Sequence, residues 1–172
     1  MRYYNCDIVF AEIPDETTLA INITGCPNRC AGCHSPHLQE DIGTTIDEEE
    51  LRFLLDRYGS CITCICFMGG DSQPREVARL AVAARTMYPK LRTAWYSGMK
   101  CLPEKSLSEA FDYIKLGPWI EAMGPLGSPT TNQRLYKIEN GTMTDITWRF
   151  QKGQDSSFRD CDQVSSDLQR TE

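Results

Sequence analysis

The stretch Cys61-Ile-Thr-Cys-Ile-Cys-Phe-Met-Gly-Gly-Asp71 decides the fold that we expect for this chain. Residues 61–68 form a nearly continuous apolar run with β-branched members, which is typical of a buried strand in a parallel sheet. Gly69, Gly70 and Asp71 end the run, as expected where a strand turns into the next element. The stretch therefore predicts an internal strand of an α/β sheet.

The segments on either side of this strand carry helix patterns. Residues 74–87 predict a helix, because Pro74 stands near the start and apolar residues recur on one face. Residues 47–58 predict another helix, since Asp47 suits the N-cap position, acidic residues fill the first turn and three leucines form an apolar stripe. Gly59 is expected to end this second helix.

Further strands are expected at 18–24, 91–96 and 113–116, a short extended piece at 7–11 and a weaker helix at 103–111. Residues 134–148 predict a β-hairpin, because Asn140-Gly141 favours a tight turn between two strands. Residues 153–172 are polar and poor in large apolar side chains, which predicts a disordered tail after a single domain at 1–152.

Strands that alternate with helices favour repeated βα units and a parallel sheet. In such sheets, binding sites form at the carboxyl ends of the strands. Three segments of interest follow expected strands: a cysteine-rich loop at 25–34, the turn at 69–71 and Ser97-Gly98. We therefore expect these three loops to meet at one edge of the sheet.

The loop Gly25-Cys-Pro-Asn-Arg-Cys-Ala-Gly-Cys-His34 carries three cysteines at the spacing C-x3-C-x2-C. Thiolates on one loop select zinc, Cu(I) or the iron of an iron–sulfur cluster. A structural zinc site or a closed cubane cluster takes four ligands, so three cysteines predict a cluster with one open corner.

The composition excludes several classes of protein. The 172 residues carry a net charge of -6, which argues against a general nucleic-acid binder or a binder of anionic membranes. The chain has no apolar run long enough to span a membrane and no signal-peptide pattern, so a cytoplasmic location is expected. Nine cysteines, an odd number with three on one loop, argue against a disulfide framework.

Several motifs together resemble the radical S-adenosylmethionine (SAM) superfamily, and more narrowly the activating proteins of the anaerobic ribonucleoside-triphosphate reductase. The resemblance covers about residues 3–150. The motifs that carry it are the segments 24–34, 67–71, 95–98, 111–118 and 132–134. Asp71 stands where many members of the superfamily have Glu, which keeps the charge and shortens the side chain.

The resemblance implies an α/β fold in the form of a partial, open barrel of parallel strands. It implies a [4Fe-4S] cluster on Cys26, Cys30 and Cys33, with the amino and carboxylate groups of SAM on the fourth iron. SAM would lie beside the following residues: Gly32, Cys33, His34, Gly69, Gly70, Asp71 and Ser97. Reductive cleavage of SAM would give methionine and a 5'-deoxyadenosyl radical, so no protein side chain need act as acid, base or nucleophile.

The protein substrate implied by the resemblance is the anaerobic reductase, on which the enzyme would generate a glycyl radical. Cleavage of SAM requires a cluster whose reduction potential is at the low end of the range for iron–sulfur proteins. Flavodoxin or a ferredoxin is therefore expected as reductant. Two enzyme alternatives are a relative of the pyruvate formate-lyase activator and a deazapurine-forming enzyme. Asn132-Gln-Arg134 and the short chain argue against both.

A non-catalytic alternative is a zinc-binding module in which His34 or His37 completes the three cysteines. A second metal site at Cys61, Cys64 and Cys66 is also conceivable from the sequence. Cys64 and Cys66 lie on one face of an apolar strand, however, so packing in the core is favoured for them.

Overall fold

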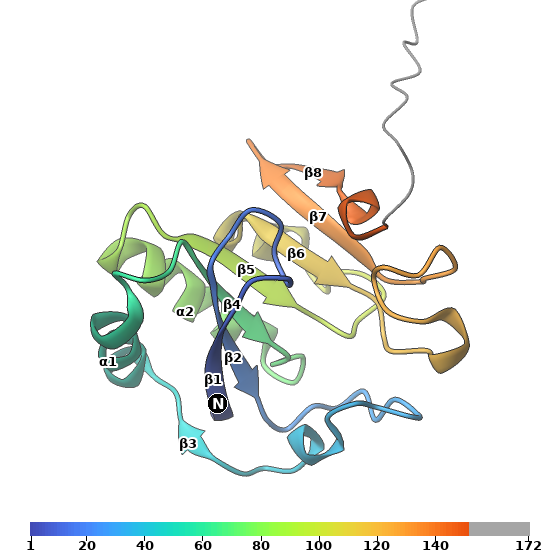
Figure 1. Cartoon of the computed structure of the whole chain (residues 1–172). Coiled ribbons are helices and arrows are strands. Elements are labelled where there is room, and N and C mark those ends of the chain that lie inside the picture. Colours follow the sequence, from blue (N-terminus) through green and yellow to red (C-terminus); the bar gives the residue numbers. More distant parts are fainter. Residues whose placement is uncertain (152–172) are drawn as a thin grey trace, which may run out of the picture.

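The computed structural model describes residues 1–151, which fold around one mixed eight-stranded sheet (Figure 1). The strand order is β3-β1-β2-β4-β5-β6-β7-β8. The strands are β1 (Arg2–Val9), β2 (Thr18–Ile23), β3 (Thr44–Thr45), β4 (Cys64–Met68), β5 (Arg92–Tyr96), β6 (Tyr113–Leu116), β7 (Arg134–Glu139) and β8 (Thr142–Asp145). The helices are α1 (Glu48–Tyr58) and α2 (Pro74–Met87), with short 3-10 helices η1 (Pro36–Gln39), η2 (Lys105–Ala110), η3 (Glu121–Met123) and η4 (Thr147–Phe150).

Among the strands of residues 1–151, the four central ones, β2, β4, β5 and β6, are parallel to one another. Strand β1 runs antiparallel to β2 on one flank, and β7 runs antiparallel to β6 on the other. The expectation of parallel strands therefore holds for the centre of the sheet, and the hairpin predicted at 134–148 forms one antiparallel flank. The antiparallel strand β1 on the other flank was not expected. The connection between β1 and β2 and the turn between β7 and β8 are too short for crossover helices, so each joins antiparallel neighbours. The longer connection from β6 to β7, residues 117–133, contains only the 3-10 helix η3 and brings β7 back antiparallel to β6.

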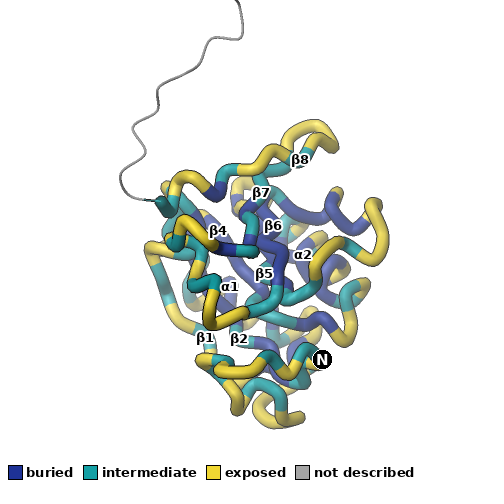
Figure 2. Tube along the Cα trace, turned by 90° about the vertical axis from the view of Figure 1, so that its right-hand side faces the viewer, coloured by how far each residue is buried: buried dark blue, intermediate teal, exposed yellow. Residues whose placement is uncertain are grey.

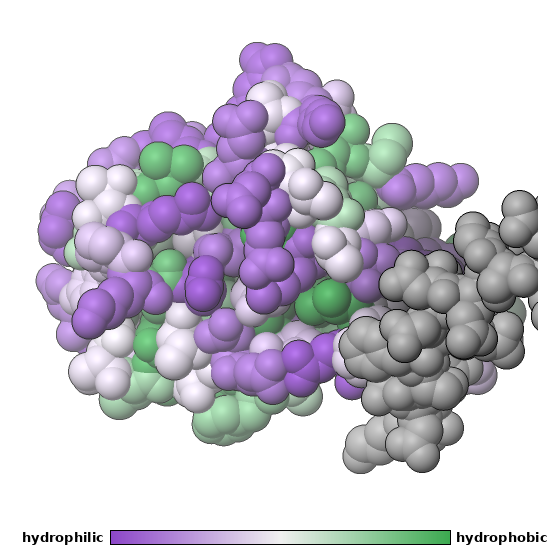
Figure 3. Space-filling view, turned by 90° about the horizontal axis from the view of Figure 1, so that it is seen from above, coloured by the Kyte–Doolittle hydropathy of each residue, from purple (hydrophilic) through white to green (hydrophobic). Residues whose placement is uncertain are grey.

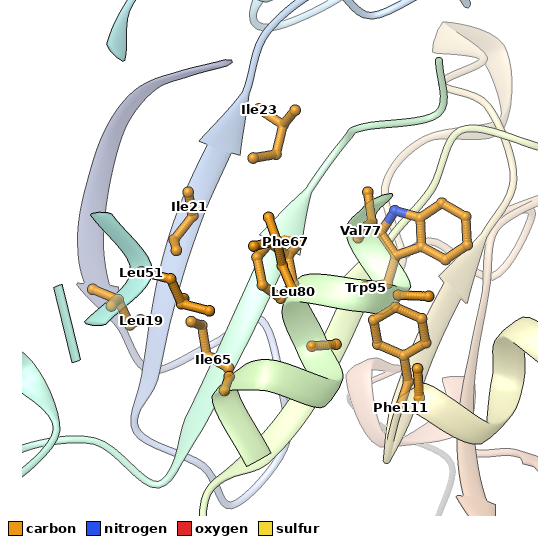
Figure 4. Close-up of a cluster of buried hydrophobic side chains, with 14 of the residues drawn as sticks. Leu19, Ile21, Ile23, Leu51, Ile65, Phe67, Val77, Leu80, Trp95 and Phe111 are labelled. Atoms are coloured by element: carbon orange, nitrogen blue, oxygen red, sulfur yellow. The ribbon is translucent and has the colours of Figure 1, made fainter. Parts of the chain in front are cut away.

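The helices cover one face of the sheet and form the larger part of the core. Buried side chains of β2, β4 and β5 pack there against α1 and α2 (Figure 4). The labelled members are Leu19, Ile21, Ile23, Leu51, Ile65, Phe67, Val77, Leu80, Trp95 and Phe111. Figure 2 shows this buried centre along the middle strands, with exposed residues concentrated in the surrounding loops.

The opposite face of the sheet carries a smaller core. Its buried members are Ile13, Cys64, Cys66, Ala94, Tyr113 and Leu135. The connection between β1 and β2 crosses this face, as Figure 1 shows, and inserts Ile13, which is fully buried. The Tyr113 hydroxyl donates to Glu16 Oε1 at 3.1 Å and holds the same connection against β6.

The helices predicted at 47–58 and 74–87 and the hairpin are confirmed. The helix α1 begins after Asp47, whose carboxylate accepts from the backbone N–H groups of Glu49 and Glu50 at 3.0 Å each. The turn between β7 and β8 has positive φ angles at Asn140 (51°) and Gly141 (74°), as a tight hairpin requires.

The strands β2 and β5 are each one residue shorter than predicted, β8 ends at Asp145, and the extended piece predicted at 7–11 is part of the longer strand β1. Two further differences have a visible cause. The strand β4 begins at Cys64 rather than Cys61, because the Cys61 N–H closes a turn onto the Tyr58 carbonyl at 2.8 Å. The weaker helix is only the 3-10 helix η2, in which the Ser108 hydroxyl donates to the Lys105 carbonyl at 2.7 Å and competes with helical pairing. The predicted tail at 153–172 lies outside the described residues.

Neither the helices nor the surface of the described residues shows a long apolar stretch of helix. None of the helices in residues 1–151 is long and apolar enough to cross a bilayer. Seen from above in Figure 3, hydrophilic residues surround separate hydrophobic spots.

Candidate functional site

The carboxyl ends of the four parallel strands meet at one edge of the sheet, where the arrowheads in Figure 1 point to the same side. One row of paired residues crosses the strands close to this edge, on the face opposite the helices. It consists of Asn22, Met68, Tyr96 and Lys115, each the direct partner of the next. The row and the loops that follow these strands form the candidate site.

The cysteine loop leaves β2 at this edge and is fixed at its base. The backbone N–H of Gly25 donates to Glu40 O, and that of Cys26 donates to Leu38 O, both at 3.0 Å. Gly25 has a φ of 72°, which a residue with a side chain rarely adopts, so this glycine makes the turn out of the strand. The base of the loop therefore has a defined position at the end of β2.

Asp71 joins the three loops that were expected to meet. Its Oδ2 accepts a hydrogen bond from Asn28 Nδ2 in the cysteine loop and another from the Gly98 N–H after β5, at 2.8 Å in the second case. The other oxygen, Oδ1, is buried and has no hydrogen-bond partner among residues 1–151. Asp71 itself is only 9% exposed. One carboxylate oxygen at the centre of the junction is thus buried without a partner in the part of the chain that the structure describes.

Lys115, at the end of β6, places a cation beside this junction. It is 9% exposed, and its Nζ donates to Gly117 O at 2.7 Å. Burial lowers the pKa of Lys115 to about 8, while Asp71 and Cys30 act in the opposite direction. Lys115 Nζ also donates to Ser97 O at 3.5 Å, which places the ammonium group beside the turn after β5.

Gly69 and Gly70 have structural roles that need no ligand. Gly70 has a φ of 86°, and a Cβ there would lie 2.5 Å from Val77 Cγ2 of α2. The Gly69 carbonyl accepts from Trp95 Nε1 at 2.7 Å, and the Gly70 carbonyl accepts from the Gln73 N–H at 2.9 Å. A contact of SAM with these two carbonyls, which the expected position of SAM beside Gly69 and Gly70 would allow, therefore competes with bonds that the carbonyls already make.

Ser97 is also part of the junction but is only 1% exposed. Its hydroxyl oxygen accepts from the Met99 N–H at 3.0 Å, and its own N–H donates to Lys115 O at 2.9 Å. These contacts shape the turn after β5. A direct contact between Ser97 and SAM stays a prediction.

A segment after β6 covers the far end of the cysteine loop. The rings of His34 and Trp119 have centroids 4.2 Å apart, and a Cβ at Gly32 would lie 3.2 Å from Glu121 Oε2. Trp119 Nε1 is buried without a hydrogen-bond partner in the described chain. A surface hollow of about 640 Å³ borders this contact and is lined by Ala31, Trp119, Ile120, Glu121 and Ala122.

The three cysteines fit an iron–sulfur cluster in number and chemistry. Cys26, Cys30 and Cys33 are free thiols, each partly exposed, on one loop at a strand end. Within residues 1–151, however, no three His, Cys, Asp or Glu side chains are arranged to hold a metal ion. To bind a cluster, the three thiols would have to turn toward one another. The loop therefore supplies the sulfur ligands, but their arrangement is not preformed.

Cys64 and Cys66 are packed in the core, as favoured from the sequence. Both are fully buried, and burial raises the pKa of both thiols, so they stay protonated at neutral pH. Cys61 is exposed and lies before the strand begins. The structure therefore gives no support to a second metal site at these three residues.

The sequence pattern missed three residues that build the site: Asn28, Trp119 and Glu121. Asn28 lies inside the cysteine motif, but nothing in the spacing predicts that its amide reaches Asp71. Trp119 and Glu121 follow Gly117-Pro118 after a strand, and that position at a strand end was the available signal. No protein-family model, curated protein or solved structure matches the chain.

Proposed function

We propose that this chain is a radical SAM enzyme in which Cys26, Cys30 and Cys33 hold a [4Fe-4S] cluster. The observation that carries the proposal is the junction at the carboxyl edge of the parallel strands. There the cysteine loop, the Gly-Gly-Asp turn and Ser97-Gly98 are joined through Asp71. A donor set of three thiols beside a buried carboxylate oxygen without a partner suits a cluster that needs one further, non-protein ligand.

When bound, the reduced cluster supplies one electron for cleavage of a carbon–sulfur bond in SAM. The role of the chain's own residues is to bind the cluster and to bind and orient SAM. The three thiolates hold the iron, the free Asp71 Oδ1 can accept from the SAM ammonium group, and Lys115 can face the SAM carboxylate. Asp71, Ser97 and Lys115 are almost fully buried, which favours exclusion of water from the reacting region.

His34 and Gly32 would lie at the adenosine end of SAM in this proposal. The indole of Trp119 beside His34 offers an aromatic surface and an unpaired N–H donor to a purine. We also propose that the mixed sheet, with its parallel centre, is the partial barrel typical of this superfamily. The hollow lined by Ala31 of the cysteine loop and by Trp119 is the proposed side of approach for a protein substrate.

The proposed substrate is a glycine residue of the anaerobic ribonucleoside-triphosphate reductase, on which the enzyme generates a radical. The support for this substrate is the likeness of five segments, including 111–118 and 132–134, to the activating proteins of that reductase. Flavodoxin or a ferredoxin is the proposed electron donor, and the cytoplasm is the proposed location. No contact with nucleic acid or membrane belongs to this proposal.

Anaerobic reconstitution tests the proposal. The full chain is loaded with iron and sulfide, reduced with dithionite and given SAM, and 5'-deoxyadenosine is measured by chromatography. The expected result is a brown protein with about four irons per chain that forms 5'-deoxyadenosine. A colourless protein that binds zinc in preference to iron would overturn the proposal and favour the zinc module. Cleavage of SAM without radical formation on the reductase would favour another small radical SAM enzyme.

A further inference from the structure

The side-chain amide of Asn28 lies between a cysteine of the loop and the carboxylate of Asp71. Its Nδ2 donates to Cys26 Sγ at 3.7 Å and also donates to Asp71 Oδ2. An amide nitrogen carries two hydrogens, so one group can serve both acceptors at once. Asn28 is therefore the direct link between the first cysteine and the turn after β4.

The neighbouring backbone is built around this amide. The Gly98 N–H donates to the same oxygen of Asp71 at 2.8 Å. A Cβ at Gly98 would overlap Asn28 Nδ2 and come within 3.3 Å of Asp71 Oδ2. Any residue other than glycine at position 98 would thus displace the Asn28 amide. Each of the three loops therefore contributes one group to this contact: the Asn28 amide, the Asp71 carboxylate and the backbone of Gly98, which has no side chain.

We infer that Asn28 is a positioning residue with two separable effects. Its bond to Asp71 ties the cysteine loop to the carboxyl edge of the sheet. Its bond to Cys26 supplies a hydrogen-bond donor to a sulfur, and this second effect rests on the proposed cluster function. Hydrogen bonds to ligand sulfurs stabilise the more negative, reduced state of an iron–sulfur cluster and raise its reduction potential.

A set of four isosteric variants separates the two effects. Asn28→Asp removes both donors and sets a second carboxylate against Asp71. The double variant Asn28→Asp with Asp71→Asn reverses the polarity of the pair, so that the new amide at 71 can donate to the new carboxylate at 28. The double variant therefore restores the bond between positions 28 and 71 but not the donor to Cys26, and the Gly98 N–H loses the acceptor that Asp71 Oδ2 provides. Asp71→Asn alone and Asn140→Asp, in the exposed turn between β7 and β8, serve as controls.

The tie is measured on the metal-free full chain by limited trypsin digestion after Arg29, which is exposed within the loop. Asn28→Asp and the double variant have the same residues next to the cleaved bond, so their rates are directly comparable. We expect cleavage of Asn28→Asp about fivefold faster than that of the double variant, as the loss of one hydrogen bond allows. Equal cleavage rates for these two variants would contradict the inference that the bond between residues 28 and 71 holds the cysteine loop in place.

The donor effect is measured as the reduction potential of the reconstituted cluster, followed by EPR. Asn28→Asp and the double variant should both have a lower potential than the wild type, while Asn140→Asp should match it. A wild-type potential in Asn28→Asp would overturn the donor role and leave the proposed function intact. If no variant and no wild-type chain assembles a cluster, the proposed function and the donor role both fall, whereas the digestion still decides the tie.

Discussion

At the scale of single residues, the cysteines of this chain divide by burial. The three loop cysteines are partly exposed and lie where a ligand can reach them, whereas Cys64 and Cys66 are fully buried beneath the β1–β2 connection. Substitution of a loop cysteine is therefore expected to have a different effect from substitution of a core cysteine. Loss of a loop thiol removes a metal donor, and loss of a core thiol removes packing.

Comparison of Cys30→Ser with Cys64→Ser checks this division. Cys30→Ser should lose the bound iron after reconstitution and keep the unfolding free energy of the metal-free chain within about 0.5 kcal/mol, because the side chain is on a partly exposed loop. Cys64→Ser should keep its iron and lose about 1–3 kcal/mol, because it buries a hydroxyl in an apolar site.

Iron content by colorimetric assay and urea unfolding of the metal-free protein are the two measurements. Loss of iron in Cys64→Ser at an unchanged free energy of unfolding would contradict the assignment of this residue to the core. Retention of iron in Cys30→Ser would contradict its role as a ligand.

At the scale of elements, the periodic segments were predicted well. The helix α2 and the strand β6 have the predicted bounds, and α1 begins one residue after the predicted N-cap. These elements are specified locally, by capping side chains, proline position and a repeating apolar face. The long strand β1 and its antiparallel pairing were not predicted, because its sequence alternates too weakly to indicate a strand of eight residues.

The candidate site was predicted in outline for a similar reason. Topology alone brings the ends of parallel strands to one edge, so the meeting of the cysteine loop, the turn at 69–71 and Ser97-Gly98 followed from the element order. The bonds that join them did not follow, because the Asn28–Asp71 pair spans 43 positions of sequence. The contact between His34 and Trp119 was missed for the same reason.

The junction between β4 and α2 gives a prediction at this scale. Gly70→Ala should lower the unfolding free energy by about 2–4 kcal/mol, because it combines a positive φ with a clash against Val77 Cγ2 at 2.5 Å. Urea unfolding followed by tryptophan fluorescence measures the loss. Gly141→Ala is the matched control, since Gly141 has a φ of 74° but nothing within 4 Å of the added Cβ.

Gly141→Ala should therefore lower the unfolding free energy by only about 1–2 kcal/mol, the cost of a positive φ at a residue with a side chain. Equal losses at the two positions would mean that packing against α2 does not explain the glycine at 70.

At the scale of the whole molecule, the buried Lys115 makes stability depend on pH. Its pKa falls from the ordinary 10.5 to about 8 in the folded protein, mainly through desolvation. Between these values the unfolded chain binds more protons on this group than the folded chain, so its contribution to stability rises with pH. Below pH 8 both states are protonated, and the burial of the charge is a constant cost.

The difference in unfolding free energy between the wild type and Lys115→Met isolates this contribution from those of other groups. From pH 7.5 to 9.5, the wild type should gain about 2 kcal/mol relative to the variant. Urea titrations at several pH values provide the measurement. A difference that stays constant, or that changes in the opposite direction, would contradict the burial of a protonated Lys115.

The fold as a whole positions the loops of the candidate site at one edge of the sheet. The carboxyl ends of the four parallel strands lie on the same side, the helices and the β1–β2 connection cover the two faces, and antiparallel strands extend the open sheet on both flanks. The central claim is that three cysteines at this edge hold a cluster whose fourth iron is open to SAM.

EPR of the reduced, reconstituted cluster during titration with SAM tests this claim most directly. SAM that binds the open iron changes the electronic environment of the cluster. We predict that the spectrum of the wild-type protein changes with SAM and saturates at about one SAM per cluster, as expected for a cluster with three protein ligands and one open position. A cluster spectrum that stays unchanged at saturating SAM would contradict the claim.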